Sequence, residues 1–339
     1  MHNRFILPCF FLFLMSGNTS LLAAEQLTLY STLDTVAIEP LLQQFTQDTG
    51  ISIKQVSGTA EQMFERLRKE DGDTAADVFI GADVVQLQRA ESADLLQAVT
   101  SQALEAAVPA SYRDAEGYWY GLTMFVRPIF YLKHKVDTYL FYGYEEMARS
   151  AWKGRICVSS SDNPYNQSLV ASMIASHGKQ ITQKWLTKFV ANLAREPQGD
   201  DRDQLIAIGE GVCDIALANS YLYGKLAASK DAKQQQLAAK LGMLWANQPS
   251  RGVHANFRGA GVAAHAPHRA GAIKLLEYLV TENSQRWLAT HTYEYPVIDM
   301  TWTRTHRRWG RFKTDSKNMP RLGELNQTAL TLMKEAGWK

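Results

Sequence analysis

The chain has 339 residues, of which 46% are hydrophobic and 21% are charged, and its formal net charge is +2. A charge so close to zero, with both signs scattered, argues against nucleic acid, whose binding proteins carry a basic stripe. The length exceeds what one hydrophobic core usually serves, so two lobes are expected.

The first residues predict a secretory signal peptide over residues 1–24. An apolar run from Phe5 to Met15 follows Arg4 and is too short to cross a bilayer as a helix. The small residues Ala23 and Ala24 place the expected cleavage near Ala24. No second long apolar stretch follows, so we expect an exported chain.

Strands and helices alternate through the next part of the chain. The expected strands span 26–30, 51–55 and 76–81, and the expected helices span 37–49 and 59–69. Thr59 and Gln62 have the spacing of a capping box at the start of the second helix. This rhythm predicts a parallel sheet with helices on both faces.

The same rhythm returns in the middle of the chain. The expected strands span 127–132, 155–159, 213–218 and 259–264, and the expected helices span 164–177, 180–192, 201–210 and 270–281. No low-complexity linker separates the two halves. We therefore expect lobes that are joined by chain crossings in a hinged arrangement.

Two cysteines remain after residue 24, Cys157 and Cys213, each on an expected strand. In an oxidising compartment, buried thiols on neighbouring strands favour a disulfide over a reduced pair. No histidine lies at metal-binding spacing from them, so they do not predict a zinc site.

A serine-rich turn with Ser160 and Ser161 follows an expected strand and opens a helix. Asn163 is placed as its cap and Pro164 in its first turn. Free backbone N–H groups and the helix dipole would favour an anion there, although an ordinary capped helix explains the turn equally well. Arg127 lies on an apolar strand and needs a partner, which is either an acidic ligand or a nearby Asp or Glu.

Three tyrosines stand where ligands bind in open α/β folds, at the carboxyl edge of a sheet. Tyr165 belongs to the serine-rich turn, and Tyr221 and Tyr223 follow the expected strand 213–218. Residues at i and i+2 of a helix face different directions, so at most one of Tyr221 and Tyr223 points into a given site. Packing of the tyrosines onto the sheet is the alternative.

Motifs for catalysis are absent from the sequence. It contains no Gly-x-Ser-x-Gly, no Gly-x-x-x-x-Gly-Lys and no His-Glu-x-x-His. We therefore expect that the protein is not an enzyme.

Short motifs along nearly the whole exported chain resemble those of one family. They are found at residues 27–31, 49–51, 76–79, 119–122, 152–157, 165–172, 197–204, 259–262 and 293–296. The chain resembles the ferric-ion-binding periplasmic proteins of bacterial ABC importers, the bacterial transferrins, and particularly the branch whose metal ligands are mostly tyrosines.

The resemblance implies an α/β, two-lobed periplasmic binding protein fold of type II, with mixed sheets flanked by helices and hinge crossings. The implied first lobe comprises 25–122 and 254–298, and the second comprises 123–253 and 299–339. The implied function is capture of Fe(III) in the periplasm, with carbonate or another synergistic anion, and delivery to an ABC importer. Its permease and ATPase subunits would be the partners of a monomeric protein.

The resemblance also implies a site. Tyr165, Tyr221 and Tyr223 would be metal ligands, with Arg127, Ser160 and Ser161 binding the anion. Relatives carry two adjacent tyrosines where this chain has Tyr221 followed by Leu222. Two alternatives remain, namely the same scaffold binding a small organic or inorganic anion, and a periplasmic enzyme.

Overall fold

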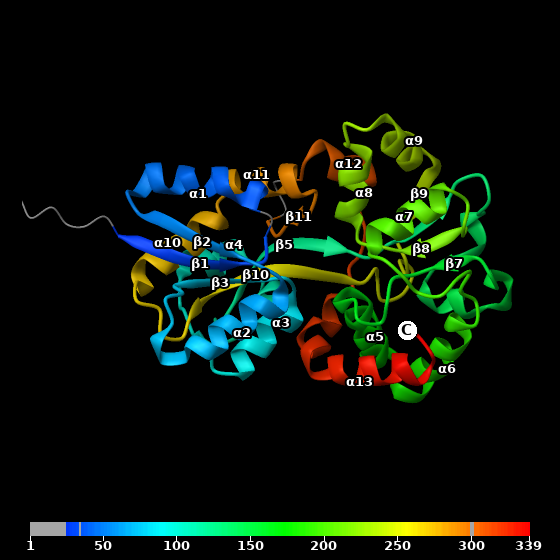
Figure 1. Cartoon of the computed structure of the whole chain (residues 1–339), viewed down its shortest axis with the longest axis horizontal. Helices are drawn as coiled ribbons and strands as arrows, with labels where there is room; N and C mark the ends of the chain where they lie inside the picture. The colour runs from blue at the N-terminus through cyan, green and yellow to red at the C-terminus, as the bar shows by residue number, and fades with distance from the viewer. Residues whose placement is uncertain (1–24, 34, 299–301) are drawn as a thin grey trace, which may run out of the picture.

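The structure, a computed structural model, describes residues 25–33, 35–298 and 302–339, and its strands form two sheets (Figure 1). The larger sheet has seven strands and the smaller has four. The expected signal peptide lies outside the described residues. Within them, no helix has the length and apolar character needed to cross a membrane.

The larger sheet is mixed, with strand order β11-β5-β10-β3-β1-β2 and β4 paired to β10. Its strands are β1 (Gln26–Ser31), β2 (Ser52–Ser57), β3 (Val78–Gly81), β4 (Leu96–Gln97), β5 (Tyr120–Val126), β10 (Ala255–Ala263) and β11 (Tyr295–Pro296). β1 is parallel to β2 and β3, whereas β10 is antiparallel to β3 and β5. The expected mixed sheet is thereby confirmed.

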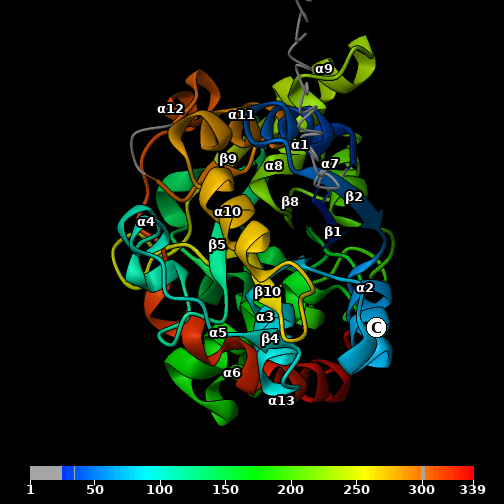
Figure 2. The ribbon, with the colours of Figure 1, turned by 90° about the vertical axis from the view of Figure 1, so that its left-hand side faces the viewer.

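Helices cover both faces of this sheet, as Figures 1 and 2 show. The helices are α1 (Thr35–Thr49), α2 (Ala60–Glu70), α3 (Val84–Ser92), α4 (Gln102–Ala107), α10 (Arg269–Leu279) and α11 (Glu282–Thr292). Side chains alternate along β1, so Leu27 and Leu29 pack with α1, α10 and α11, while Tyr30 packs with α2 and α3. The predicted capping box at α2 is confirmed, since Gln62 N donates to Thr59 Oγ1 at 3.2 Å and Thr59 N donates to Gln62 Oε1 at 3.0 Å.

The smaller sheet has strand order β7-β8-β6-β9. Its strands are β6 (Ile129–Leu132), β7 (Ile156–Cys157), β8 (Ile215–Leu217) and β9 (Leu241–Leu244), and its helices are α5 (Pro164–His177), α6 (Lys179–Val190), α7 (Asp201–Gly209), α8 (Ser220–Ala227) and α9 (Ala232–Lys240). β7 and β8 are parallel, so α5 and α8 both start at their carboxyl edge.

Some strands are shorter than predicted. β6 begins after Arg127 because Pro128 has no N–H to donate to a ladder. Cys213 precedes β8 rather than lying on it. The predicted disulfide is nevertheless confirmed, because Cys157 and Cys213 are bonded with an S–S distance of 2.08 Å.

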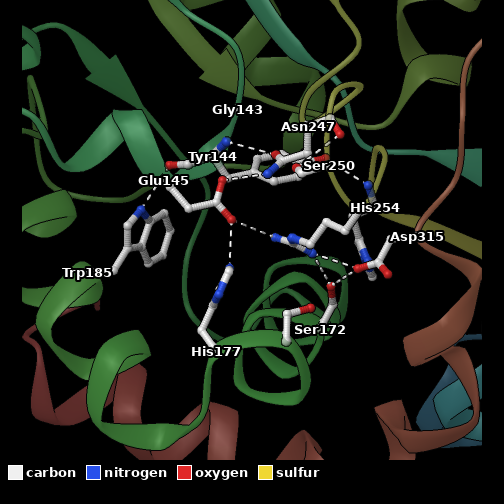
Figure 3. Close-up of polar contacts among 12 residues, drawn as sticks. Gly143, Tyr144, Glu145, Ser172, His177, Trp185, Asn247, Ser250, His254 and Asp315 are labelled. Carbon is white, nitrogen blue, oxygen red and sulfur yellow. Dashed lines mark hydrogen bonds and ion pairs between the residues drawn. The ribbon is translucent and has the colours of Figure 1, made fainter.

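The two sheets are joined by chain crossings between β5 and β6 and between β9 and β10. Arg127 N donates to His254 O at 2.9 Å, which links the crossings directly. The Tyr144 hydroxyl donates to Arg127 O at 2.6 Å. It also accepts from His254 N at 3.0 Å (Figure 3). One buried phenol therefore holds both crossings together.

A polar cluster fixes the return crossing to α5 and to the C-terminal segment (Figure 3). Arg251 Nη1 donates to Asp315 Oδ2 at 2.6 Å and to Ser172 Oγ at 2.7 Å. Glu145 Oε1 lies 2.9 Å from His177 Nε2 and 3.4 Å from Arg251 Nη2. These contacts anchor the chain immediately before β10.

Two α-helices follow Ile298 in the described part of the chain, α12 (Arg304–Trp309) and α13 (Leu322–Glu335), with a 3-10 helix at Ser316–Arg321 between them. α13 runs along α5 beside the smaller sheet (Figure 1). Its first turn also touches the helices of the larger sheet, because Gly323 N donates to Gln88 Oε1 of α3 at 2.8 Å. The C-terminal segment therefore contacts both halves.

We predict that the disulfide contributes about 4 kcal/mol to the free energy of unfolding, because it closes a loop with a sequence separation of 56. Replacing Cys157 and Cys213 together by Ala should lower that free energy by this amount in urea unfolding. Intact mass with and without reduction checks the bond itself. Two free thiols in exported protein would contradict it.

Candidate metal centre

Two of the predicted tyrosines meet at the starts of two helices. Tyr165 lies in the first turn of α5 and Tyr221 in the first turn of α8. Both rings pack edge-on against Phe125 of β5, with centroid distances of 5.0 and 6.1 Å. The two phenols also influence each other's pKa, and both interact electrostatically with Arg258, so they are neighbours.

Local sequence explains these positions. Asn163 caps α5 and its side chain accepts from Tyr165 N at 2.9 Å, with Pro164 in the first turn as predicted. Asn219 ends the segment after β8 and is the cap residue of α8. The predicted location at the carboxyl edge of a sheet is therefore confirmed for both tyrosines.

The larger sheet contributes a buried ion pair to the same place. Arg258 Nε of β10 donates to Glu294 Oε1 at 2.9 Å, and the two side chains are 11% and 3% exposed. Thr123 Oγ1 donates to the other oxygen of Glu294. Burial lowers the pKa of Arg258, but Glu294, Tyr165 and Tyr221 raise it more, so the guanidinium stays charged.

The phenols are protonated in the protein without ligand. Burial raises the pKa of Tyr165, while Arg258 lowers it. Burial likewise raises the pKa of Tyr221 well above its ordinary value, and the neighbouring Tyr165 adds to that rise. A metal ion that binds these oxygens must therefore displace protons.

The structure does not bring Tyr223 to this pair. Its ring packs against Phe130 and Trp309, with centroid distances of 5.5 and 6.1 Å. Leu222 also packs toward the apolar cluster that contains the disulfide. Side chains one and two positions apart on an α-helix point in different directions. Leu222 and Tyr223 therefore lie on other sides of α8 than Tyr221.

Arg127 pairs with a carboxylate of the protein itself. The sequence had left two partners open, an acidic ligand or a nearby Asp or Glu, and the structure shows the second. Its side chain is 1% exposed, and Nη1 donates to Asp201 Oδ2 at 2.5 Å and to Asn219 Oδ1 at 3.1 Å. Nη2 donates to Asp201 Oδ1 at 3.0 Å and to Asn166 Oδ1. These contacts place Arg127 among the helix starts.

The serine-rich turn is likewise bonded to the protein. Ser160 O accepts from Asn166 Nδ2 at 3.0 Å, and Ser160 Oγ accepts from Asp162 N at 3.2 Å. Ser161 N donates to Lys339 O at 2.9 Å. The turn is therefore built as a capped helix start, with the C-terminal residue packed against it.

Arg258 and Glu294 were not among the residues predicted for the site. The sequence did contain a signal for Arg258, namely a charged residue next to Phe257 in a strand of mostly apolar and small residues. Arg127, next to Val126, has the same kind of surroundings. In the described residues, no group of three or more His, Cys, Asp or Glu side chains could hold a metal ion. The phenol pair is therefore the metal-binding candidate.

The protein consists of two mixed α/β halves that are joined by chain crossings. The halves face one another across a group of buried polar side chains, which is the architecture of a two-lobed solute-binding protein. The chain belongs to the bacterial extracellular solute-binding protein family, whose model matches residues 31–286. The resemblance to periplasmic ferric-binding proteins is also confirmed.

Curated relatives place the chain more narrowly. It is 40% identical over 316 residues to iron uptake protein A1 of Synechocystis, covering 93% of this chain and 88% of that protein. It is 25% identical over 280 residues to the major ferric iron-binding protein of Neisseria meningitidis, covering 81% of this chain and 82% of that protein.

Solved structures agree with this placement. A Trichodesmium protein in complex with iron and citrate has a TM-score of 0.90 and 39% identity, covering 93% of this chain and 100% of that chain. The ferric binding protein of Campylobacter jejuni has a TM-score of 0.87 and 31% identity, covering 92% and 100%. The predicted type II periplasmic binding protein fold is confirmed.

We predict that Arg258 and Glu294 are strongly coupled. Arg258→Gln should lower the free energy of unfolding by about 3 kcal/mol, because it leaves a buried carboxylate without its cation. The double variant with Glu294→Gln should cost clearly less than the sum of the single variants. Urea unfolding of all four proteins measures this.

The exposed pair of Arg286 and Glu282 provides the control, with both side chains 61% exposed. Arg286→Gln should change stability by less than about 1 kcal/mol. Additive effects of the Arg258 and Glu294 substitutions would contradict the coupling.

Proposed function

We propose that this protein captures Fe(III) in the periplasm and delivers it to an ABC importer. The observation that carries the proposal is that Tyr165 and Tyr221, at two helix starts, pack on the same ring of Phe125 and interact electrostatically with Arg258 and Glu294. Fe(III) is a small, hard cation that prefers anionic oxygen, and a bound cation strongly favours deprotonation of its ligands. The relatives named for iron uptake support the same cargo.

Two phenolates leave coordination positions for other oxygen ligands, such as carbonate or another synergistic anion. Arg258 interacts electrostatically with both phenols and is the best candidate to hold that anion. The anion role predicted for Arg127, Ser160 and Ser161 is less favoured, because their groups bond mainly to the protein itself. Tyr223 is the weakest candidate ligand, since its ring packs elsewhere.

The second candidate function is binding of a small anion without metal. Arg258, a buried guanidinium beside two protonated phenols, favours it, because these groups could all donate hydrogen bonds to one oxyanion. No observation favours an enzyme, and the relatives are named for iron uptake and binding.

We also propose the extent of the two lobes, the partners of the protein and its location. The first lobe would comprise 25–122 and 254–298, and the second 123–253 and 299–339. The pairing of β5 with β10 up to Val126 favours extending the first segment of the first lobe to that residue. The protein would act as a monomer that docks on the permease, with the ATPase on the other side of the membrane. Export through a signal peptide over residues 1–24 would place it in the periplasm.

We predict a visible absorption band when Fe(III) is added, since phenolate-to-iron charge transfer absorbs visible light. Tyr221→Phe should abolish the band with little loss of stability, whereas Tyr223→Phe on the same helix should leave it unchanged. Two protons must leave for two phenolates to bind, so affinity should fall by up to about a hundredfold per unit of decreasing pH. Titration of iron against a competing chelator at several pH values measures this.

A colourless wild-type protein that takes up no iron at neutral pH would contradict the iron hypothesis. Binding of citrate or phosphate by that colourless protein, detected by calorimetry, would then favour the anion hypothesis.

We further predict that ligand binding closes the two lobes by motion about the crossings. The radius of gyration from small-angle scattering should decrease when Fe(III) is added to saturation. Tyr221→Phe serves as the control, because it should show no compaction under the same conditions. An unchanged radius in the saturated wild-type protein would argue against closure.

A further inference from the structure

A short segment of the chain carries a concentration of positive charge that the proposed function does not use. Residues 302–313 contain five cationic residues and no Asp or Glu, whereas the whole chain has a formal net charge of only +2. The five are all exposed, namely Arg304, Arg307, Arg308, Arg311 and Lys313. Such a run of like charges is either a solvated surface or a site for an anionic partner.

Two of these arginines line a hollow between α11 and α12, which lie next to one another in Figures 1 and 2. The hollow has a volume of about 450 Å³, within the range of about 300–1,000 Å³ that is typical of small-molecule sites. Its walls include Arg286 and Thr290 of α11 and Arg304 and Arg307 of α12. No Asp or Glu of the described residues lines it, so the hollow is cationic.

Helix spacing groups the polar side chains on each wall of the hollow. Arg304 and Arg307 are three residues apart on α12, and Arg286 and Thr290 are four apart on α11. Residues at these spacings are neighbours on one helix face, with Cβ atoms about 5–6 Å apart. Arg307 is also held in place, because its Nη1 donates to Trp302 O at 2.6 Å.

The positive charge of the hollow is not neutralised by the protein. Arg286 pairs with Glu282, but both side chains are exposed and such a pair is weak. Neither Arg304 nor Arg307 forms an ion pair with any described residue. Like charges three residues apart on a helix destabilise one another, so an anion between them would remove that repulsion.

The helix that carries two of the arginines is anchored in the fold by its other side chains. Trp309 packs against Tyr295 of β11 and Tyr223 of α8, with centroid distances of 6.0 and 6.1 Å. His306 is buried, and its Nε2 lies 3.3 Å from Tyr293 O at the end of α11. The arginines therefore project from a helix that is fixed against α11 and α8.

We propose that the hollow between α11 and α12 binds a small oxyanion with two or more negative charges, of the polycarboxylate or phosphate type. A guanidinium presents a planar fork of donors that matches the oxygens of both groups. Arg304 and Arg307 would hold the anion from α12, and Arg286 would hold it from α11. None of the lining residues belongs to the candidate metal centre, so this site is separate from the phenol pair and independent of the iron function.

Calorimetric titration of citrate and of inorganic phosphate into the iron-free protein tests the proposal. At least one anion should bind, and the one that binds more tightly identifies the class of ligand. The affinity should fall as the ionic strength rises. Arg304→Gln combined with Arg307→Gln should weaken binding by about tenfold or more, because charge-assisted hydrogen bonds are lost. Both residues are exposed, so the variant should fold as the wild type does.

The matched control is Arg308→Gln combined with Arg311→Gln. It removes the same charge from the same exposed segment, but neither residue lines the hollow. This variant should bind the anion with an affinity close to that of the wild type. Tyr221→Phe is a second control, because it alters the phenol pair and should also leave this binding unchanged.

Three outcomes would overturn the inference. The first is that neither anion binds at millimolar concentration. The second is an equal loss of affinity in the two arginine variants, which would show general attraction to a basic surface rather than a site. The third is a loss in Tyr221→Phe but not in the Arg304 and Arg307 variant, which would place the anion at the phenol pair. Iron takes no part in these measurements, so failure of this inference and failure of the iron hypothesis are distinguishable.

Discussion

The ion pair between Arg127 and Asp201 determines where the metal-binding candidates lie. The side chains are 1% and 3% exposed, and the guanidinium contacts Asp201 of α7, Asn166 of α5 and Asn219 at the cap of α8. Three helix starts are thereby held around one cation. A buried pair of this kind is weak evidence for stability, but its fixed geometry fixes the spacing between Tyr165 and Tyr221.

Further hydrogen bonds to Asp201 and to the carbonyl of Arg127 reinforce this arrangement. Asp201 also accepts from Asn163 Nδ2 at 2.9 Å, from Ser159 Oγ at 3.1 Å and from Asn219 N at 3.1 Å. The carbonyl of Arg127 accepts from Tyr144, the phenol that holds the two crossings together. Two buried donors of the network, Arg127 Nε and Asn219 Nδ2, have no hydrogen-bond partner among the described residues. The other contacts still tie the helix starts that carry the two tyrosines to one ion pair.

The sequence predicted those parts of the fold and the site that depend on local patterns. Alternating strands and helices, the cap at Asn163 and the placement of Tyr165 and Tyr221 after strands follow from residues close together in the chain. Arg127 was recognised as needing a partner, but Asp201 is 74 residues away. Arg258 carried the same signal, and its partner Glu294 is 36 residues away. Pairings over such distances are decided by packing, which no local pattern contains.

The directions in which the side chains of α8 point have the largest consequence for function. Tyr221 faces the space between the lobes, while Leu222 and Tyr223 pack toward the second-lobe core near the disulfide and Phe130. The second lobe therefore offers two phenol oxygens, fewer than a six-coordinate cation accepts. The remaining positions are open to water, to an anion or to oxygen atoms of the first lobe, where Arg258 and Glu294 interact electrostatically with both phenols. A first-lobe ligand, or an anion held by Arg258, would couple completion of the metal site to the approach of the two lobes, so the orientation of Tyr223 away from the pair favours binding with closure.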